Sequence, residues 1–102
     1  EYDSALYANK KQKTTPESAL EALNALLPTL EGLTDWNKDA IFEAGKQKAA
    51  DMGVKNGWLM YPLGIALSGR QRTPGGGTDL AAMLGKEETL ARVKAAIAKL
   101  SA

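Results

Sequence analysis

The residues best suited to binding chemistry stand together in one glycine-rich segment, GRQRTPGGG, at residues 69–77. Arg70 and Arg72 flank a glutamine, and three glycines follow at residues 75–77. Arginine carries forked donors that suit phosphates and base edges. Glycines ahead of a helix expose backbone N–H groups that an anion can approach closely. The segment therefore predicts contacts with a nucleic acid, and the alternative is a plain flexible connection.

Catalysis by this chain alone is not expected. The sequence has neither cysteine nor histidine, which excludes disulfides, thiolate metal sites and every Ser-His or Cys-His arrangement. The acidic residues are scattered, and no pair stands out as the two carboxylates of a glycosidase. The glycine run also lacks the Lys-Ser/Thr and the preceding strand of a nucleotide-binding P-loop. We predict no catalytic residue, no metal site and no cofactor in this chain.

The charge of the whole chain is nearly balanced, with 13 Lys and Arg against 12 Asp and Glu. Domains that bind nucleic acid are usually basic, so any affinity for RNA must come from the distribution of charge. A second basic cluster, Lys10, Lys11 and Lys13, lies near the start. We interpret residues 1–14 as a basic lead-in or linker and residues 15–102 as the folded domain.

Length and hydropathy predict one soluble domain. A chain of 102 residues is large enough for one core without disulfides. No apolar run approaches the roughly 20 residues that cross a bilayer, and the start is too polar for a signal peptide. We expect a cytoplasmic monomer that makes no membrane contact. Because the sequence does not begin with Met, we also expect it to be a piece of a longer protein.

Five helices are predicted to position the glycine-rich segment, and the first begins at Thr15. Thr15 is a good N-cap, and Pro16 suits the first helical position. Pro28 lacks a backbone donor and crowds the turn before it, so it should bend or end this helix. The apolar stripe at helical spacing consists of Leu20, Leu23, Leu26, Leu27 and Leu30.

A second helix is predicted over residues 35–52, capped by Thr34 or Asp35. Trp36 would lie in its first turn and anchor the core. Gly53 stands where a left-handed C-terminal cap belongs. The side that faces the core is expected to contain Ala40, Ile41, Ala44, Lys48 and Met52.

The third element is ambiguous in the sequence. The dipeptide at residues 56–57, Asn-Gly, is a turn signal, and a β-hairpin is one alternative. We favour a helix that begins near Trp58, with Pro62 in the opening turn, where backbone donors are unpaired anyway. Gly69 would end this helix. Its buried face would contain Leu59, Leu63, Ile65, Ala66 and Leu67.

Two further helices complete the prediction, one over residues 78–84 and one over residues 86–100. Gly85 separates them, and the acidic pair at residues 87–88 suits the positive end of the last helix. The apolar stripe of this last helix contains Leu90, Val93, Ile97 and Leu100. With no convincing strand, the chain is predicted to be all-α, a compact bundle of about five helices.

Aromatic side chains matter because the bases of single-stranded RNA stack on them. Most aromatic residues of this chain fall in helix stripes and are expected in the core. Trp58 and Tyr61 are the candidates for exposed rings.

The stretch from Gly53 to Leu100 resembles the glutamyl-tRNA synthetases. In that family a phrase near PLRxALSG is followed by a TPG-type loop and then by a helix with LGKEExLxR. The matching phrases here are Pro62-Leu63-Gly64, Ala66-Leu67-Ser68-Gly69, Thr73-Pro74-Gly75 and Leu84-Gly85-Lys86-Glu87-Glu88 with Arg92. Several linked phrases at the right spacing are specific, and a weaker similarity extends back to about Tyr2.

The resemblance implies the C-terminal, anticodon-binding domain of a bacterial glutamate–tRNA ligase. That class I synthetase joins glutamate to its tRNA with ATP and Mg²⁺, which belong to a catalytic domain bearing HIGH-type and KMSKS-type signatures. Neither signature occurs in this sequence, so the chain is expected to be non-catalytic by itself. The expected partners are the anticodon loop of tRNA(Glu) and the remaining domains of the parent synthetase.

The resemblance places RNA contacts at position 64 and around the TPG-type loop. Joined with the two arginines, the predicted RNA-binding residues are Gly64, Arg70, Arg72, Thr73, Pro74, Gly75, Gly76 and Gly77. The family usually has Arg where this chain has Gly64, and glycine supplies no forked donor. We expect either partial compensation by Arg70 or Arg72, or relaxed anticodon selectivity. The other matched side chains are expected to stabilise the last helix: Lys86, Glu87, Glu88 and Arg92.

Two alternatives stay open. A helical protein-interaction domain would show an exposed apolar groove and no basic face. A structural appendage that has lost RNA contact would show no salt-dependent affinity for RNA, and Gly64 is the feature that favours it.

Overall fold

The computed structural model describes residues 7–8, 14–69 and 76–101. This part of the chain contains five α-helices and no strand, which confirms the all-α prediction and makes the hairpin alternative wrong. None of these described helices is long and apolar enough to cross a membrane. The helices are α1 (Pro16–Glu31), α2 (Lys38–Met52), α3 (Asn56–Ser68), α4 (Gly76–Leu84) and α5 (Lys86–Ser101).

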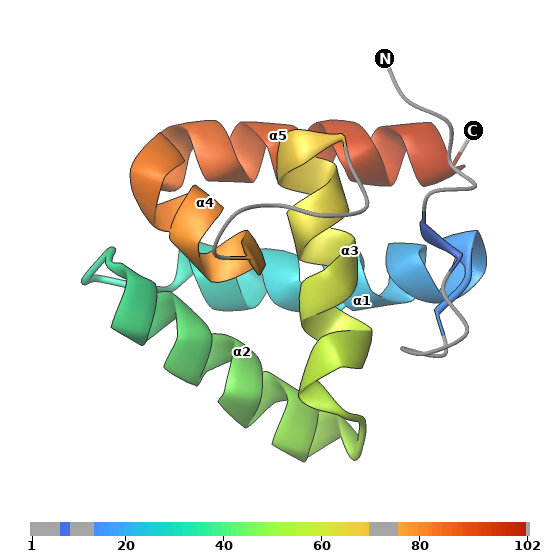
Figure 1. Cartoon of the computed structure of the whole chain (residues 1–102), viewed down its shortest axis with the longest axis horizontal. Coiled ribbons are helices and arrows are strands. Elements are labelled where there is room, and N and C mark those ends of the chain that lie inside the picture. Colours follow the sequence, from blue (N-terminus) through green and yellow to red (C-terminus); the bar gives the residue numbers. More distant parts are fainter. Residues whose placement is uncertain (1–6, 9–13, 70–75, 102) are drawn as a thin grey trace.

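Helix α3 is the central element of the bundle. Figure 1 shows α1 and α5 side by side and antiparallel, with α3 crossing them. α3 contacts each of the other four helices. A helix that is apolar on all sides must be covered on all sides, and α3 fits this description. Its buried residues are Leu59, Pro62, Leu63, Gly64, Ile65, Ala66 and Leu67.

Helix α1 begins as predicted and runs past its proline. The hydroxyl of Thr15 accepts the N–H of Ser18 at 3.0 Å, and the hydroxyl of Ser18 accepts the N–H of Thr15 at 2.8 Å. This reciprocal cap satisfies donors that the helix leaves unpaired. Pro28 does not end the helix, which continues to Glu31. The last turn is held in place because Leu30 is fully buried in the core.

The start of α2 differs from the prediction. Neither Thr34 nor Asp35 caps it; the side chain of Asn37 does, accepting the N–H of Ala40 at 2.8 Å. Trp36 therefore precedes the helix instead of lying in its first turn. At the other end, the helix stops as predicted at Gly53, whose φ of 71° favours glycine.

The buried side of α2 is made of smaller residues than predicted. Ile41 is buried as expected, but Gly45 and Ala49 accompany it, while Ala44 and Lys48 are half-buried. A Cβ atom on Gly45 would lie 2.7 Å from the Sδ atom of Met60 in α3. The small side chains therefore allow α2 and α3 to approach closely.

Pro62 lies deeper in its helix than predicted. Because α3 begins at Asn56, two residues before the expected start, Pro62 falls in the second turn. A proline there removes one backbone hydrogen bond and costs about 3 kcal/mol. Its ring is fully buried, and removal of this apolar surface from water offsets part of that cost. Gly69, with a φ of 72°, ends the helix as predicted.

Part of the segment before α1 joins the core. Tyr7 is fully buried, and its carbonyl oxygen accepts the hydroxyl of Thr14 at 2.7 Å. Lys10, Lys11 and Lys13 lie outside the described residues. The division between a lead-in and a domain at residue 14 stays a prediction.

At the corner between α4 and α5, three hydrogen bonds are made to one carbonyl group. The oxygen of Ala81 accepts the N–H of Gly85 at 3.1 Å, the indole N–H of Trp36 at 2.9 Å and the hydroxyl of Thr89 at 3.2 Å. Carbonyls in the last turn of a helix have no partner within it. Side chains from outside α4 supply the missing donors here, so Trp36 anchors the corner.

The hydroxyl of Thr89 gives a measurable test of this corner. Thr89 is fully buried, so Thr89→Val keeps the shape and removes one buried hydrogen bond. We expect a loss of about 1 kcal/mol in the free energy of unfolding, measured by urea denaturation. Thr29→Val is the control, since the hydroxyl of Thr29 is 3.4 Å from the Ala25 oxygen and a change of less than about 0.5 kcal/mol is expected. Equal stability of the two variants would contradict the role given to Thr89.

Candidate nucleic-acid interface

Three of the eight predicted RNA-binding residues belong to the described part of the chain, and they lie on α3 and α4. Gly64 lies within α3, and Gly76 and Gly77 are the first two residues of α4. The other predicted residues lie outside the described part of the chain: Arg70, Arg72, Thr73, Pro74 and Gly75. The described part thus fixes both ends of the predicted segment on two helices that pack against each other.

Helix α4 begins two residues earlier than predicted, at Gly76 in place of Thr78. The first four N–H groups of a helix have no partner within it, and Gly76 and Gly77 supply the first two. The positive end of the helix dipole also favours an anion at this place. The carboxylate of Asp79 in the same turn is 3.0 Å from the Nζ atom of Lys38, which balances its negative charge.

Gly64 is buried in the central helix, where its carbonyl oxygen accepts the hydroxyl of Ser68 at 2.7 Å. A buried glycine exposes little surface of its own. An arginine at this position would have to pass between neighbouring groups to reach a ligand. The role of position 64 in RNA binding therefore stays a prediction.

The phrase at residues 84–92, which carries part of the resemblance, serves the fold. Gly85 has a φ of 87°, a conformation that favours glycine. The Nζ atom of Lys86 donates to the carbonyl oxygen of Leu33 at 2.7 Å, and Arg92 Nη1 donates to the carbonyl oxygen of Leu67 at 2.6 Å. These two contacts join α5 to the segment after α1 and to the last turn of α3, which agrees with a structural role for Lys86 and Arg92.

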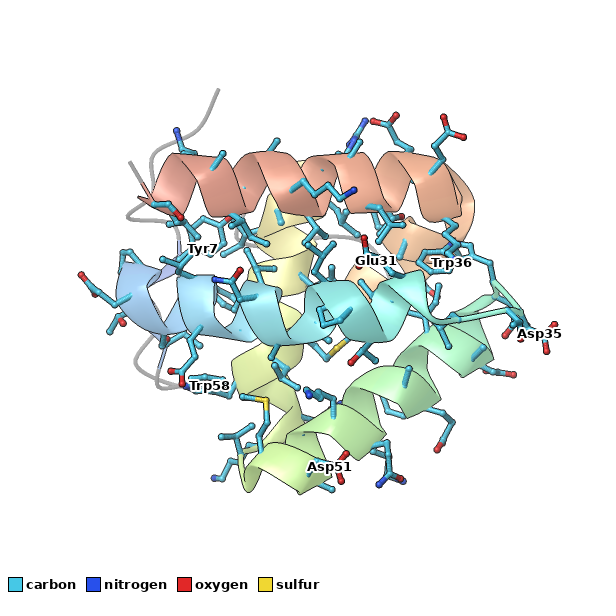
Figure 2. All side chains as sticks on the ribbon, turned by 180° about the vertical axis from the view of Figure 1, so that it is seen from behind. Tyr7, Glu31, Asp35, Trp36, Asp51 and Trp58 are labelled. Atoms are coloured by element: carbon cyan, nitrogen blue, oxygen red, sulfur yellow. The ribbon has the colours of Figure 1, made fainter. Side chains whose placement is uncertain are left out.

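The two tryptophans lie beside different parts of α1. Figure 2 shows Trp36 beside the C-terminal end of α1 and Trp58 beside its N-terminal half. Trp58 and Tyr61 are half-buried, and Phe42, which is 41% exposed, is an exception to the expectation that most aromatic residues lie in the core. Trp58 lies about 16 Å along α3 from Gly69, at 1.5 Å per residue.

The burial of one polar atom at the N-terminal end of α3 was not predicted from the sequence. The Oδ1 atom of Asn56 is buried and has no hydrogen-bond partner among the described residues. The sequence marked Asn56 only as a turn signal, and its burial depends on the packing of helices. No three acidic side chains in the described ranges gather closely enough to hold a metal ion.

The sequence matches the model of one protein family, described as an anticodon binding domain, over residues 1–97. A glutamate–tRNA ligase of Clostridium acetobutylicum is 44% identical over 100 residues, which are 98% of this chain and 21% of that protein. A glutamate–tRNA ligase of Clostridium botulinum is 45% identical over 102 residues, the whole chain and 21% of its relative. The chain spans about a fifth of the length of these curated relatives.

A solved structure shows the same fold. It is the crystal structure of a glutamate tRNA ligase from Elizabethkingia meningosepticum in complex with its amino acid. The TM-score is 0.81 at 32% sequence identity, and the match covers 98% of this chain and 19% of that one. The likeness is therefore confined to one region of a much longer protein.

Proposed function

We propose, since this chain belongs to the family of anticodon binding domains, that it binds the anticodon loop of tRNA(Glu). The observation that carries the proposal is the family match over residues 1–97, on a fold that a glutamate tRNA ligase shares. The names of the curated relatives support glutamate as the amino acid of the parent enzyme. The helical-appendage and protein-interaction alternatives have no comparable support.

The parent enzyme, in this proposal, is a glutamate–tRNA ligase that charges tRNA(Glu) with the use of ATP and Mg²⁺ in the cytoplasm. This chain corresponds to about a fifth of such a protein, and the reaction belongs to the remaining domains. The chain contributes by holding the far end of the tRNA. Binding energy realised there positions the acceptor end at a distant active site.

The chemistry of the junction between α3 and α4 suits this task. Arg70 and Arg72 supply forked donors for phosphates and base edges, while the N–H groups of Gly76 and Gly77 favour an anion at the start of α4. Phosphate contacts set the position of an RNA, and contacts with unstacked bases select its sequence. Both kinds of contact are available within residues 70–77.

An NMR titration of the labelled domain tests the proposal. The ligand is the anticodon stem-loop of tRNA(Glu), and the control is the same stem-loop with its third anticodon base changed. We expect shifts clustered at residues 69–77 and near Gly64, weaker for the altered base and weakened by added salt. Absence of localised shifts at high RNA concentration would favour the appendage alternative. Equal shifts with both RNAs would contradict recognition of the third anticodon base but would still support phosphate binding.

Position 64 gives a separate prediction. Gly64→Arg restores the residue that the resemblance implies, and one added charge-assisted contact should raise affinity for the stem-loop about tenfold. A gel-shift comparison with both stem-loops measures affinity and selectivity together. A melting curve is the control for folding, because Gly64 is buried and the larger arginine side chain has to be accommodated among its neighbours. Unchanged affinity and selectivity in a folded variant would remove position 64 from the interface.

A further inference from the structure

The three methionines of this chain have very different surroundings. Met83, in the last turn of α4, is 83% exposed, and Phe42, at 41%, is the other exposed large apolar side chain among the described residues. Met52 and Met60 are half-buried and pack against the core. The three side chains therefore share one chemistry but differ in their access to solvent.

The sulfur atoms of these methionines are the groups of the chain that a peroxide attacks most readily. The sequence contains no cysteine, so no thiolate competes for the oxidant. Among side chains of the same type, the exposure of the sulfur determines which one reacts first. By this criterion Met83 precedes Met52 and Met60.

The sulfur of Met60 lies at a close contact between α2 and α3. A Cβ atom on Gly45 of α2 would lie 2.7 Å from the Sδ atom of Met60 and 3.5 Å from its Cε atom. Gly45 is buried, so the thioether packs directly against the backbone of α2. An oxygen atom added to this sulfur would put a polar group into that contact, where Gly45 has no side chain to bond it.

We propose that Met83 is the site at which a peroxide modifies this protein, reversibly and without loss of the fold. A lone pair of the Met83 sulfur attacks one oxygen of hydrogen peroxide. The S–O bond forms as the O–O bond breaks, and the departing hydroxide takes up the proton of the transferred hydroxyl, which leaves a sulfoxide and water. The sulfur loses two electrons, and the peroxide gains them.

The reverse step needs a dithiol, which acts through methionine sulfoxide reductases. The dithiol becomes a disulfide, and the sulfoxide oxygen leaves as water. Because Met83 is 83% exposed, its sulfoxide is hydrated and needs no partner from the protein. The hydrogen bond that anchors the end of α4, from the indole of Trp36 to the Ala81 oxygen at 2.9 Å, does not involve the Met83 side chain. Oxidation is therefore tolerated on α4, whereas at Met60 it would loosen the contact between α2 and α3.

Hydrogen peroxide applied to the folded 102-residue chain tests the proposal. Mass spectrometry of proteolytic peptides gives the rate of oxygen addition at each methionine. We expect Met83 to react at least about fivefold faster than Met52 and Met60. In concentrated urea, which exposes all three sulfurs, the rates should agree within about twofold. Met52 or Met60 reacting as fast as Met83 in the folded chain would overturn the proposal, as would a preference for Met83 that persists in urea.

Met83→Leu and Met60→Leu are the matched variants, since leucine has nearly the volume of methionine and no sulfur to oxidise. The fast reaction should disappear in Met83→Leu and remain in Met60→Leu. A fast reaction that survives in Met83→Leu would assign it to another residue and contradict the proposal.

The melting temperature separates the tolerated oxidation from the damaging one. The chain oxidised once, at Met83, should melt within about 3 °C of the untreated chain, and the reductases with a dithiol should restore the untreated mass. Prolonged oxidation should lower the melting temperature of the wild type more than that of Met60→Leu. A clear fall after the first oxygen, or a modification that the reductases cannot remove, would overturn the proposal.

Discussion

Replacing Arg70 and Arg72 together by Gln is expected to weaken binding of the anticodon stem-loop about 100-fold. A hydrogen bond to a charged group contributes about 1.5–3 kcal/mol, and two such losses reach the roughly 3 kcal/mol that separate affinities 100-fold apart. If each arginine neutralises one phosphate, the slope of log affinity against log salt should fall by about 1.4. Fluorescence anisotropy with a labelled stem-loop at several salt concentrations measures both quantities.

The control for this variant removes the same charge elsewhere. Lys46 and Lys55 are exposed, in α2 and just before α3. Their joint replacement by Gln lowers the net charge of the chain equally, and screening should keep its effect on binding below about threefold. Equal losses in the two double variants would mean that binding follows net charge alone. Full affinity in Arg70→Gln/Arg72→Gln would remove both arginines from the interface.

Three helix ends were predictable from the sequence through a side-chain or glycine cap, whereas the Asn37 cap of α2 was not. Thr15, Gly53 and Gly69 lie where their local chemistry indicated. A capping hydroxyl or a left-handed glycine depends on a few neighbouring residues and needs no knowledge of the remaining chain. The identity of the fold class followed from the same local evidence, since amphipathic stripes at helical spacing recur between these caps.

Pro28 does not end its helix and Pro62 lies deeper in its helix than predicted, because tertiary packing decides the effect of each proline. Pro28 lies in the last turns of α1, next to residues held in the core, and Pro62 is itself buried in the central helix. A rule based on neighbouring residues accounts for the missing donor and the crowded turn of a proline. It does not account for the apolar surface that neighbouring helices cover, whose burial offsets part of the free-energy cost of proline in a helix.

The long-range contacts of the last helix were not predicted from the sequence either. Arg92 reaches Leu67 across 25 residues, and Lys86 reaches Leu33 across 53. The sequence phrase that contains them indicated a role in the fold but named no partner. The predicted RNA-binding residues came from charge and glycine content and, for position 64 and the TPG-type loop, from the family resemblance. The structure places only Gly64, Gly76 and Gly77 of them.

The leucine stripe of α1 shows the limit of periodicity as a guide to burial. The sequence assigned both Leu26 and Leu27 to the core-facing stripe. In the structure Leu26 is fully buried, whereas Leu27 is only partly covered and packs at the edge of the core. Adjacent positions on a helix point about 100° apart, so one of two neighbouring leucines must turn away from the centre of the stripe.

Leu26→Ala is therefore expected to destabilise the domain by about 3 kcal/mol, within the 2–5 kcal/mol found for leucines truncated in packed cores. The cost combines the lost burial of the side chain with the cavity left among α1 and its neighbours, which relax only in part. For a domain of this size the melting temperature should fall by about 15 °C. Denaturant titration gives the free energy directly, and an unchanged slope would show that the unfolded state is not altered.

Leu27→Ala is the matched comparison, because it deletes the same atoms one residue further along the same helix. Its partial exposure should limit the loss to about 1 kcal/mol, since less apolar surface returns to water and no closed cavity forms. The difference between the two variants isolates the packing of the core from helix propensity, which the shared substitution cancels. Equal losses would place both leucines in the core and contradict the burial on which this packing of α1 depends.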